Sequence, residues 1–550
     1  MRRTRSALAI VALTGLALGV TQGDVSRVAD AQVASATFTS LNGRVYVANE
    51  NTNSISILAP AVDTSTNTYG SPIIATICLG SDTADDLAGT PGANFASFGA
   101  PCDGNADHHK PFYDGQVGTH GLWLTPDYST LLATNRISST VVAIDANAAA
   151  QCNATTARGC PLAITWGLPA TDPKLAAGAY APVGREPHLT SVRPVLNPAA
   201  NQVWEAWVAV RGEHYVDVLN VDRTLLTSSD SKLEPPDRLP RSAPSVDTAL
   251  GPSMVSFTTD GQYAFVAMGK QKVVQRFNAT DRSPTATVDV AAPFTPFGLV
   301  APPDLSGPPD DRGEDLYLVH KGVGQLSILK NLRTDNIGFA PLGGGRQWNG
   351  VPIGPCANHV AFAGKFAYVT IGGPPPCAPA VPNDPTGPAN NSRQGGIVVV
   401  DRASRQLVAA SQALLSLASA GAGSPSLLDA WASLGINTAP ILSAAYNVNN
   451  VTNSAYSLVL ADGTATWTGD PHGIWATPDG RYVFVGHESG NRVTTIFRAD
   501  PTDPSKDIVA GTISAGSSLD ASAQTCSVSG NVSPISCLRQ PIDVVFQPLS

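Results

Sequence analysis

Short runs of alternating hydrophobic and polar residues recur along the chain, and each run is long enough for one strand. Two stretches show the pattern best: THGLWLTPDYSTLLATNRISSTVVAID at 119–145 and DPHGIWATPDGRYVFVGHESGNRVTTIF at 470–497. Each stretch opens with a short apolar run, turns at a Pro-Asp pair, and continues through two runs with β-branched or aromatic residues at alternate positions. A period of two predicts antiparallel strands.

The pattern of the second and third predicted strands recurs through most of the chain. Seven segments share it, and they begin at Val45, Leu131, Val203, Tyr263, Asp315, Phe366 and Tyr482. A small sheet that cannot bury both of its faces alone has to stack on its neighbours, and seven such units suit a closed ring. The sequence therefore predicts an all-β protein, a seven-bladed β-propeller over residues 32–550 in which the final PIDVVFQPL pairs with the first segment and closes the ring.

Long connections rich in Gly, Pro and Ser separate the blades. They cover about 61–116, 147–182 and 374–396, and a partly helical insertion is expected at about 407–466. Loops of this length in a compact fold are often functional lids, although disorder is an alternative interpretation.

The first residues predict export. MRRTRS is followed by an apolar stretch from Ala7 to Val20, which indicates a signal peptide over residues 1–31 with cleavage between 23 and 31. No later segment is apolar for long enough to cross a bilayer, so we expect a soluble protein in the periplasm or outside the cell. The net charge of −9 offers no basic footprint for nucleic acid.

Cysteine spacing agrees with an oxidising compartment. The eight cysteines form four pairs that are close in sequence: Cys78 and Cys102, Cys152 and Cys160, Cys356 and Cys377, and Cys526 and Cys537. Disulfides that staple loops are the preferred interpretation, and the sequence leaves the actual pairing open.

The histidines carry the main indication of chemistry, because all nine fall at related points of the repeat. His120, His188, His359 and His472 begin the first strand of a unit, while His214, His320 and His487 lie between its second and third strands. The remaining pair, His108 and His109, lies in a connection between blades. In a propeller all these positions lie at one end of the central channel. We therefore predict a metal site there, since imidazole suits copper, zinc or iron. A hydrogen-bonded structural role is the alternative for any single histidine.

Other groups near this rim have the chemistry to assist a metal. Lys321 and Glu488 are the candidate catalytic residues, for proton delivery or for polarising a bound oxygen. Carboxylates that could orient imidazoles through the second ring nitrogen are Asp107, Glu186, Glu213, Asp470 and Glu488. Ordinary solvated charges are the alternative interpretation of these side chains.

Two resemblances follow from these motifs. VYVANENTNSISIL, from Val45, resembles the YVTN-type repeats of bacterial seven-bladed propellers, which implies the fold but not an activity. The two stretches at 119–145 and 470–497, together with LGPSMVSFTTDGQYAFVAMGKQKVVQRF and the DHHKP pair, are similar to the blades of the nitrous oxide reductase propeller.

The second resemblance implies an activity. In that family, histidines on the channel face hold a multinuclear copper centre with sulfide, which reduces nitrous oxide to dinitrogen. Carried over, His108, His109, His120, His188, His359 and His472 would bind copper, and His214, His320 or His487 would complete the set. The family's cupredoxin domain has no counterpart here, so electrons would come from an external donor such as a cytochrome c or a cupredoxin.

Other functions remain open at this stage. A copper thiol oxidase, a lyase or a lactonase would need fewer histidines and a single copper, zinc or other divalent ion. A YVTN-type propeller that only binds a partner would need no metal. Each enzyme would act on a small-molecule substrate, and a homodimer is compatible with the sequence.

Overall fold

A computed structural model describes the strands of the propeller and the shorter connections between them. The described residues are 41–50, 54–62, 69–70, 73–79, 118–151, 180–195, 202–212, 215–222, 237–238, 251–269, 271–290, 296–300, 315–321, 324–339, 351–353, 357–372, 396–410, 471–488, 492–498, 500–504, 507–514 and 541–549.

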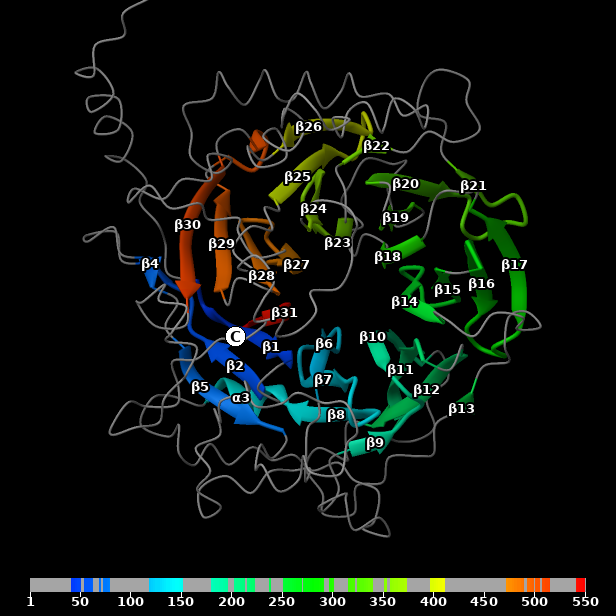
Figure 1. The fold of residues 1–550 in the computed structure, drawn as a ribbon, viewed down its shortest axis with the longest axis horizontal. Coiled ribbons are helices and arrows are strands. Elements are labelled where there is room, and N and C mark those ends of the chain that lie inside the picture. Colours follow the sequence, from blue (N-terminus) through cyan, green and yellow to red (C-terminus); the bar gives the residue numbers. More distant parts are fainter. Residues whose placement is uncertain are drawn as a thin grey trace, which may run out of the picture.

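These residues form seven antiparallel sheets around a central axis, as predicted (Figure 1). We number the sheets as blades and give the strands from the axis outward. Blade 1 contains β31 (Pro541–Pro548), β1 (Gly43–Asn49), β2 (Ser54–Leu58) and β5 (Ile73–Cys78). Blade 2 contains β6 (Thr119–Leu124), β7 (Thr130–Asn135), β8 (Thr140–Asp145) and β9 (Tyr180–Pro182). Blade 3 contains β10 (Pro187–Pro194), β11 (Gln202–Val210), β12 (Tyr215–Asp222) and β13 (Asp237–Arg238).

The remaining blades follow the same order. Blade 4 contains β14 (Pro252–Phe257), β15 (Tyr263–Met268), β16 (Val273–Asn278) and β17 (Pro284–Asp289). Blade 5 contains β18 (Pro296–Val300), β19 (Leu316–His320), β20 (Gln325–Lys330) and β21 (Gly338–Phe339), with β22 (Val351–Pro352) also paired to β20. Blade 6 contains β23 (Ala357–Ala363), β24 (Phe366–Ile371), β25 (Gly396–Asp401) and β26 (Gln406–Ala410). Blade 7 contains β27 (Pro471–Ala476), β28 (Tyr482–His487), β29 (Arg492–Arg498) and β30 (Asp507–Ser514).

The ring closes through strands from opposite ends of the sequence. β31 pairs antiparallel with β1, with Tyr46 opposite Val545 and Val47 opposite Val544. Each innermost strand also contacts the innermost strands of both neighbouring blades. The C-terminal segment therefore provides the axial strand of the first blade, which is the closure that the sequence predicts.

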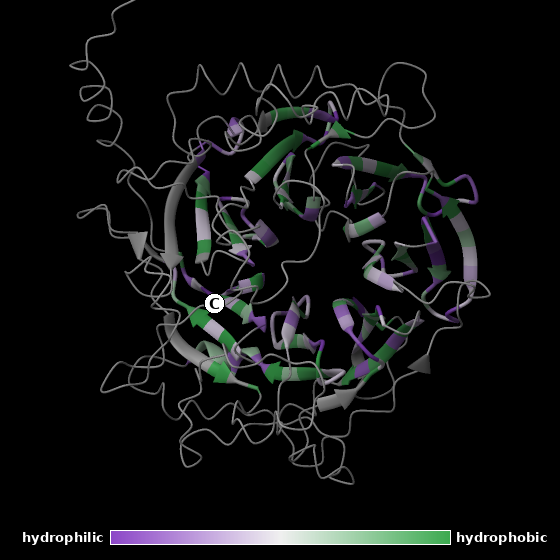
Figure 2. Cartoon of the chain, viewed as in Figure 1, coloured by the Kyte–Doolittle hydropathy of each residue, from purple (hydrophilic) through white to green (hydrophobic). Residues whose placement is uncertain are grey.

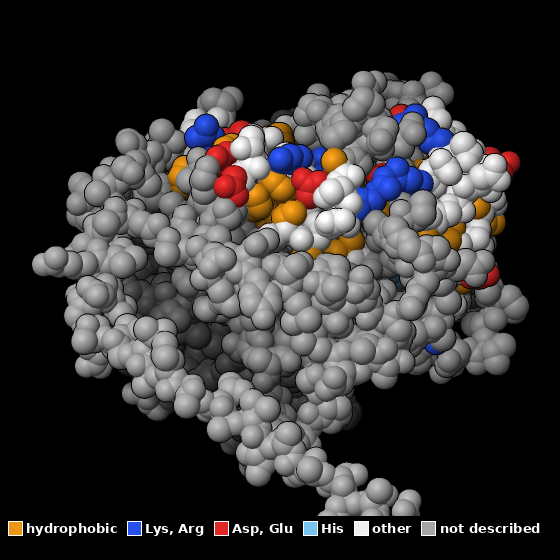
Figure 3. Space-filling model, turned by 90° about the horizontal axis from the view of Figure 1, so that it is seen from above, with side chains coloured by type: hydrophobic (Ala, Val, Ile, Leu, Met, Phe, Trp, Pro, Cys, Tyr) orange, Lys and Arg blue, Asp and Glu red, His pale blue; other side chains and the backbone are white. Residues whose placement is uncertain are grey.

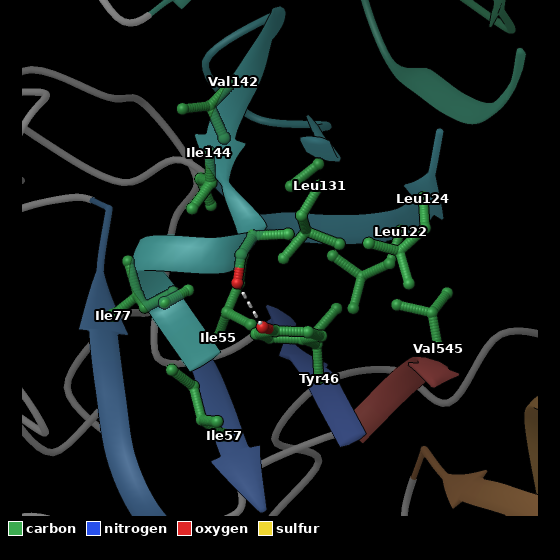
Figure 4. Packing of buried hydrophobic residues seen from close by; sticks show 14 of the residues in the cluster. Tyr46, Ile55, Ile57, Ile77, Leu122, Leu124, Leu131, Val142, Ile144 and Val545 are labelled. Atoms are coloured by element: carbon green, nitrogen blue, oxygen red, sulfur yellow. Dashed lines mark hydrogen bonds between the residues drawn. The ribbon is translucent and has the colours of Figure 1, made fainter. Parts of the chain in front are cut away.

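Apolar side chains pack mainly between neighbouring blades. One cluster joins blades 1 and 2 through Tyr46, Ile55, Leu122 and Leu131 (Figure 4), and similar clusters fill the other junctions. The Tyr46 hydroxyl donates to the Ala146 carbonyl at 3.1 Å and so satisfies its buried polar end. Figure 2 shows apolar residues along the strands and polar stretches near the axis, which is where chemistry can be placed.

The predicted Pro-Asp turns join the first and second strands of blades 2 and 7, and a Thr-Asp turn at 259–260 does the same in blade 4. In each turn a threonine hydroxyl contacts the aspartate and accepts the backbone N–H of the residue that starts the return strand. Thr125 accepts from Thr130 N at 3.0 Å, and Thr477 accepts from Tyr482 N at 3.0 Å. The turns lie at the end of the inner strands opposite to the histidines.

Only small elements lie outside the seven sheets in the described part of the chain. They are the helix α3 (Ala146–Ala150), capped by the Asp145 carboxylate, and the pair β3 (Ala61–Val62) and β4 (Tyr69–Gly70). None of the described helices is long and apolar enough to cross a membrane. The predicted signal peptide, the cysteine side chains and the part of the predicted insertion beyond β26 lie outside what is described. The surface in Figure 3 carries basic and acidic side chains near one another.

The inner strands approach so closely that some positions have room only for glycine. A Cβ on Gly121 would lie 2.6 Å from the His188 carbonyl oxygen of the next blade. We expect Gly121→Ala to lower the free energy of unfolding by about 1–3 kcal/mol, because backbone of the next blade would have to move. Gly338→Ala is the matched control, since no atom lies within 4 Å of its added methyl group. Urea denaturation measures both variants, and equal stability of the two would contradict this packing.

Candidate functional site

Every inner strand has an irregular register at its first residues, all at the same end of the ring. A bulge leaves an extra residue unpaired and redirects its side chain, which is why bulges occur beside active sites. The shifts lie between Thr119 and Leu122, Pro187 and Thr190, Pro252 and Met254, Pro296 and Leu299, Ala357 and Val360, Pro471 and Ile474, and in β31 opposite Ala48 and Asn49.

The bulges bring four of the predicted histidines together with one phenylalanine. The ring centroids of His120 and His188 are 4.5 Å apart, those of His120 and His472 are 5.9 Å apart, and those of His359 and His472 are 4.7 Å apart. Phe297 of β18 contacts His188, His359 and His472 with centroid distances of 5.3, 6.1 and 6.5 Å. We call these four histidines the axial histidines.

Hydrogen bonds between neighbouring blades hold the bulges in place. They run from a side chain of one blade to the backbone of the next: Thr134 Oγ1 to His188 O (2.7 Å), His188 Nδ1 to Ser253 O (2.7 Å), Ser253 Oγ to Phe297 O (2.7 Å), Thr370 Oγ1 to His472 O (2.6 Å) and His472 Nδ1 to Ile542 O (3.1 Å). Between blades 1 and 2, Leu122 N donates to Asp543 Oδ2 at 2.8 Å. The axial histidines are thus part of the structure that joins the blades.

Two of these bonds determine which ring nitrogen carries the proton. A carbonyl oxygen can only accept, so His188 and His472 carry hydrogen on Nδ1 and keep the lone pair on Nε2. Metal-binding histidines almost always have this arrangement, with the second nitrogen donating to a carbonyl or a carboxylate. His120 has a similar neighbour, because its Nδ1 lies 3.6 Å from Glu50 Oε1.

Three nitrogens of the axial histidines lack a hydrogen-bond partner. Among the described residues, Nδ1 and Nε2 of His120 and Nε2 of His359 are buried without one. The axial histidines are all at most 6% exposed. A buried polar atom without a partner costs about 1–3 kcal/mol, so such atoms in a native structure suggest a bound group.

Burial keeps these imidazoles neutral. It lowers the pKa of His120 to about 4 and that of His359 to about 3, and it holds the pKa of His188 and of His472 well below the usual value. Neighbouring charges act in addition, since Glu50 opposes the shift at His120 and Lys321 reinforces it at His472. A neutral imidazole is the form that binds metal ions.

The spacing of the rings is compatible with a shared ion, but the nitrogens are not gathered at one point. Two imidazoles that bind one ion at about 2.1 Å have centroids within about 6.4 Å of each other. The three neighbouring pairs meet this limit. In the described residues, however, no group of three or more His, Cys, Asp or Glu side chains is arranged to hold a metal ion. Metal binding would require the rings to turn.

The other predicted ligands are placed differently or lie outside the described residues. Nε2 of His320 is 2.8 Å from the Ser327 hydroxyl, and Nε2 of His487 is 2.9 Å from the Thr494 hydroxyl. These hydroxyls belong to the third strands, so both nitrogens are directed away from the axis instead of toward it. His108, His109 and His214 lie outside the described ranges, as do Asp107, Glu213 and Asp470.

Of the two predicted catalytic residues, the structure places Lys321 beside the axial histidines. Its Nζ lies 4.4 Å from the centroid of Phe297, and its charge lowers the pKa of His359 and of His472. Glu488 directly follows β28 and is half-buried. Glu186, predicted as an orienting carboxylate, is exposed and directly precedes β10.

Several residues of the site were not predicted. Phe297 stands in P-F-G as His472 stands in P-H-G, so an alignment of the repeats on this motif would have found it. Asp543 follows the equivalent position in blade 1. Burial raises its pKa to about 7, while its carboxylate accepts the N–H groups of Leu122 and Val544. Glu50 belongs to no sequence motif. Its place in the chain, directly after β1, is the one sequence feature that relates it to the site.

Comparisons with known proteins concern the fold. No protein-family model and no curated protein matches the chain. A putative 6-phosphogluconolactonase from Bacteroides uniformis is 12% identical with a TM-score of 0.46, covering 92% of this chain and 99% of its own. A periplasmic gluconolactonase from Pseudomonas aeruginosa is 14% identical with a TM-score of 0.44, covering 92% and 98%. Hydrazine synthase from Kuenenia stuttgartiensis is 16% identical with a TM-score of 0.39, covering 69% and 77%. At such identities a likeness says nothing about activity.

The neutral histidines make the stability of the metal-free protein sensitive to acid. Histidine in an unfolded chain has a pKa of about 6.5. Because the folded pKa values are lowered, the stabilisation is present above pH 6.5 and is lost as the pH falls toward the folded values. For each such histidine, the free energy of unfolding is about 2 kcal/mol lower at pH 5 than at a pH well above 6.5. The raised pKa of Asp543 acts in the opposite sense, since its stabilisation is lost as the pH rises through about 7.

The histidines outnumber this carboxyl group, so we expect a net loss of stability on acidification. Guanidinium denaturation of metal-free protein at about pH 8 and about pH 5 measures it. His359→Gln should reduce the difference between the two pH values, because one neutral buried imidazole is removed. An unchanged free energy of unfolding between the two pH values would contradict the burial of neutral histidines.

Proposed function

We propose that this protein is a metal-dependent enzyme and that the axial histidines bind a first-row transition metal. The supporting observation is the hydrogen bonding of two of their rings. Nδ1 of His188 and of His472 donates to a backbone carbonyl, so that Nε2 keeps its lone pair. The unpartnered Nε2 atoms of His120 and His359 in the same cluster support the same proposal.

The chemistry of the donors favours copper or zinc. The cluster offers imidazole nitrogens, whereas magnesium and calcium prefer carboxylate, carbonyl and water oxygens. Copper is the metal that we propose first, and a single zinc or other divalent ion is the alternative. Bound copper would supply electron transfer, and bound zinc would supply Lewis-acid activation.

The chain's own residues would assist in three ways. The carbonyls of Ser253 and Ile542 fix the tautomer and orientation of His188 and His472. Phe297 covers one side of the cluster and keeps water from three of its rings. Lys321, above Phe297, is positioned to deliver a proton to a bound small molecule. These are the roles that a small-molecule oxidoreductase or a metal-assisted hydrolase requires.

Reduction of nitrous oxide to dinitrogen is the narrower form of the proposal. It needs a multinuclear copper centre with sulfide and therefore more ligands than the axial histidines supply, with His108 and His109 as the first additional candidates. It also needs an external electron donor such as a cytochrome c or a cupredoxin. A copper thiol oxidase, a lyase or a lactonase would need only the axial group, and a non-catalytic binding propeller would need no metal.

A matched pair of variants tests the metal site. His472→Gln should weaken copper or zinc binding by more than about 100-fold, since loss of a ligand costs more than loss of the group that orients it. His320→Gln should bind as the parent does, because Nε2 of His320 is directed to the Ser327 hydroxyl. Elemental analysis after dialysis gives the stoichiometry, and the nitrogen hyperfine pattern of bound Cu(II) reports imidazole ligands.

The outcomes separate the alternatives. A parent protein that retains neither copper nor zinc, or two variants that lose metal equally, would refute the axial site. Several copper ions with acid-labile sulfide, together with nitrous oxide consumption driven by a reduced viologen dye, would support the narrower proposal. A single metal ion without sulfide would support the thiol oxidase, lyase or lactonase alternatives.

A further inference from the structure

The residue that directly follows the second strand occupies an equivalent place in every blade. In blades 2, 3 and 7 the last residue of this strand pairs with the first residue of the inner strand, just before the axial histidine. The following residues therefore form a rim at the histidine end of the ring. From blade 1 to blade 7 they are Glu50, Arg136, Arg211, Gly269, Lys321, Gly372 and Glu488.

Charge is divided unevenly around this rim. The three cations Arg136, Arg211 and Lys321 belong to blades 2, 3 and 5, whereas Glu50 and Glu488 belong to the adjoining blades 1 and 7. Glu50 forms an ion pair with Arg136 at 2.9 Å. Blades 4 and 6 contribute glycine. The positive charges of the rim therefore lie on blades 2, 3 and 5, and its negative charges lie on blades 1 and 7.

Arg136 and Arg211 lie next to each other on neighbouring blades. Burial and then the charge of Arg136 lower the pKa of Arg211, while the exposed Glu186 opposes this shift. The Nε atom of Arg136 is buried and has no hydrogen-bond partner among the described residues. The two arginines thus follow equivalent strands of adjoining blades, and Glu50 is paired with Arg136.

The strand register places the two arginines beside axial histidines. Asn135, before Arg136, pairs with Thr119, before His120, and Val210, before Arg211, pairs with Pro187, before His188. Glu50 Oε1 lies 2.9 Å from Arg136 Nη1 and 3.6 Å from His120 Nδ1. An anion bound by the pair would consequently lie close to these two histidines. Guanidinium groups suit this task, because their planar donors match the two oxygens of a carboxylate or another oxyanion.

We propose that Arg136 and Arg211 bind the anionic group of the substrate, a carboxylate or a comparable oxyanion, beside the axial histidines. That the anion belongs to a substrate rests on the proposed metal-dependent activity, whereas anion binding itself does not. The anion would relieve the repulsion between the two arginines and accept from donors such as Arg136 Nε. Glu488, on blade 7, would repel it and so orient the rest of the molecule.

Sulfate binding to the metal-free full chain at low ionic strength tests this proposal. We expect calorimetry to show saturable binding and Arg211→Gln to weaken it by about tenfold or more, because a charge-assisted contact is lost. Arg481→Gln is the matched control. It removes the same charge from the exposed turn before β28, at the opposite end of the inner strand. This variant should bind sulfate as the parent does.

The outcomes for anion and metal are independent. Sulfate binding that depends on Arg211 would support the inference even if copper and zinc fail to bind. In that case only the proposed metal-dependent function would be refuted. Absence of saturable binding, or equal weakening by Arg211→Gln and Arg481→Gln, would overturn the inference even if the axial histidines bind metal. Equal binding by the Arg211→Gln variant and the parent would overturn it as well.

Discussion

The structure depends on the hydrogen bonds that pass from bulge to bulge around the axis. Apolar packing between blades is strong but non-directional, so it cannot by itself fix where each inner strand begins. Bonds such as Thr134 Oγ1 to the His188 carbonyl and Ser253 Oγ to the Phe297 carbonyl are directional. They set the register of neighbouring blades at the point where the histidines lie. His188 and His472 belong to this set of bonds, and therefore their rings are oriented by the same contacts that assemble the ring.

This double role creates a tension between stability and chemistry. Neutral imidazoles buried next to one another gain little from each other, and unpartnered nitrogens such as Nε2 of His359 are costly. A hydrophobic residue would leave no unpartnered polar atom at these positions. Ile542 and Phe297 occupy the equivalent positions of blades 1 and 5. Strain or unsatisfied groups that the rest of the fold tolerates tend to gather at functional sites. The propeller accepts this cost at one end of its axis.

The sequence predicts the blades well because the relevant interactions are local. Alternation, the Pro-Asp turns and the PIDVVFQPL segment predict the sheets and their closure. The histidines at strand starts also converge as expected. His320 and His487 could not be placed, since a strand end does not reveal which neighbour its side chain will contact. His359 is offset by one residue from the other axial histidines, because Asn358 takes the first bulge position and donates to the Pro471 carbonyl. Glu50, Arg136 and Arg211 become related only after the blades are aligned in space.

The closure of the ring by β31 has a consequence for the order of events during synthesis. The carbonyl that orients His472 belongs to Ile542, and the carboxylate that receives Leu122 N, two residues after His120, belongs to Asp543. Both are supplied by β31, which is made after every other strand of the seven sheets. Until that strand pairs with β1, His472 lacks the carbonyl that orients its ring, and Leu122 N lacks its carboxylate acceptor. A partly made chain therefore carries all the histidines of the cluster before the contacts from β31 that position His472 and Leu122 have formed.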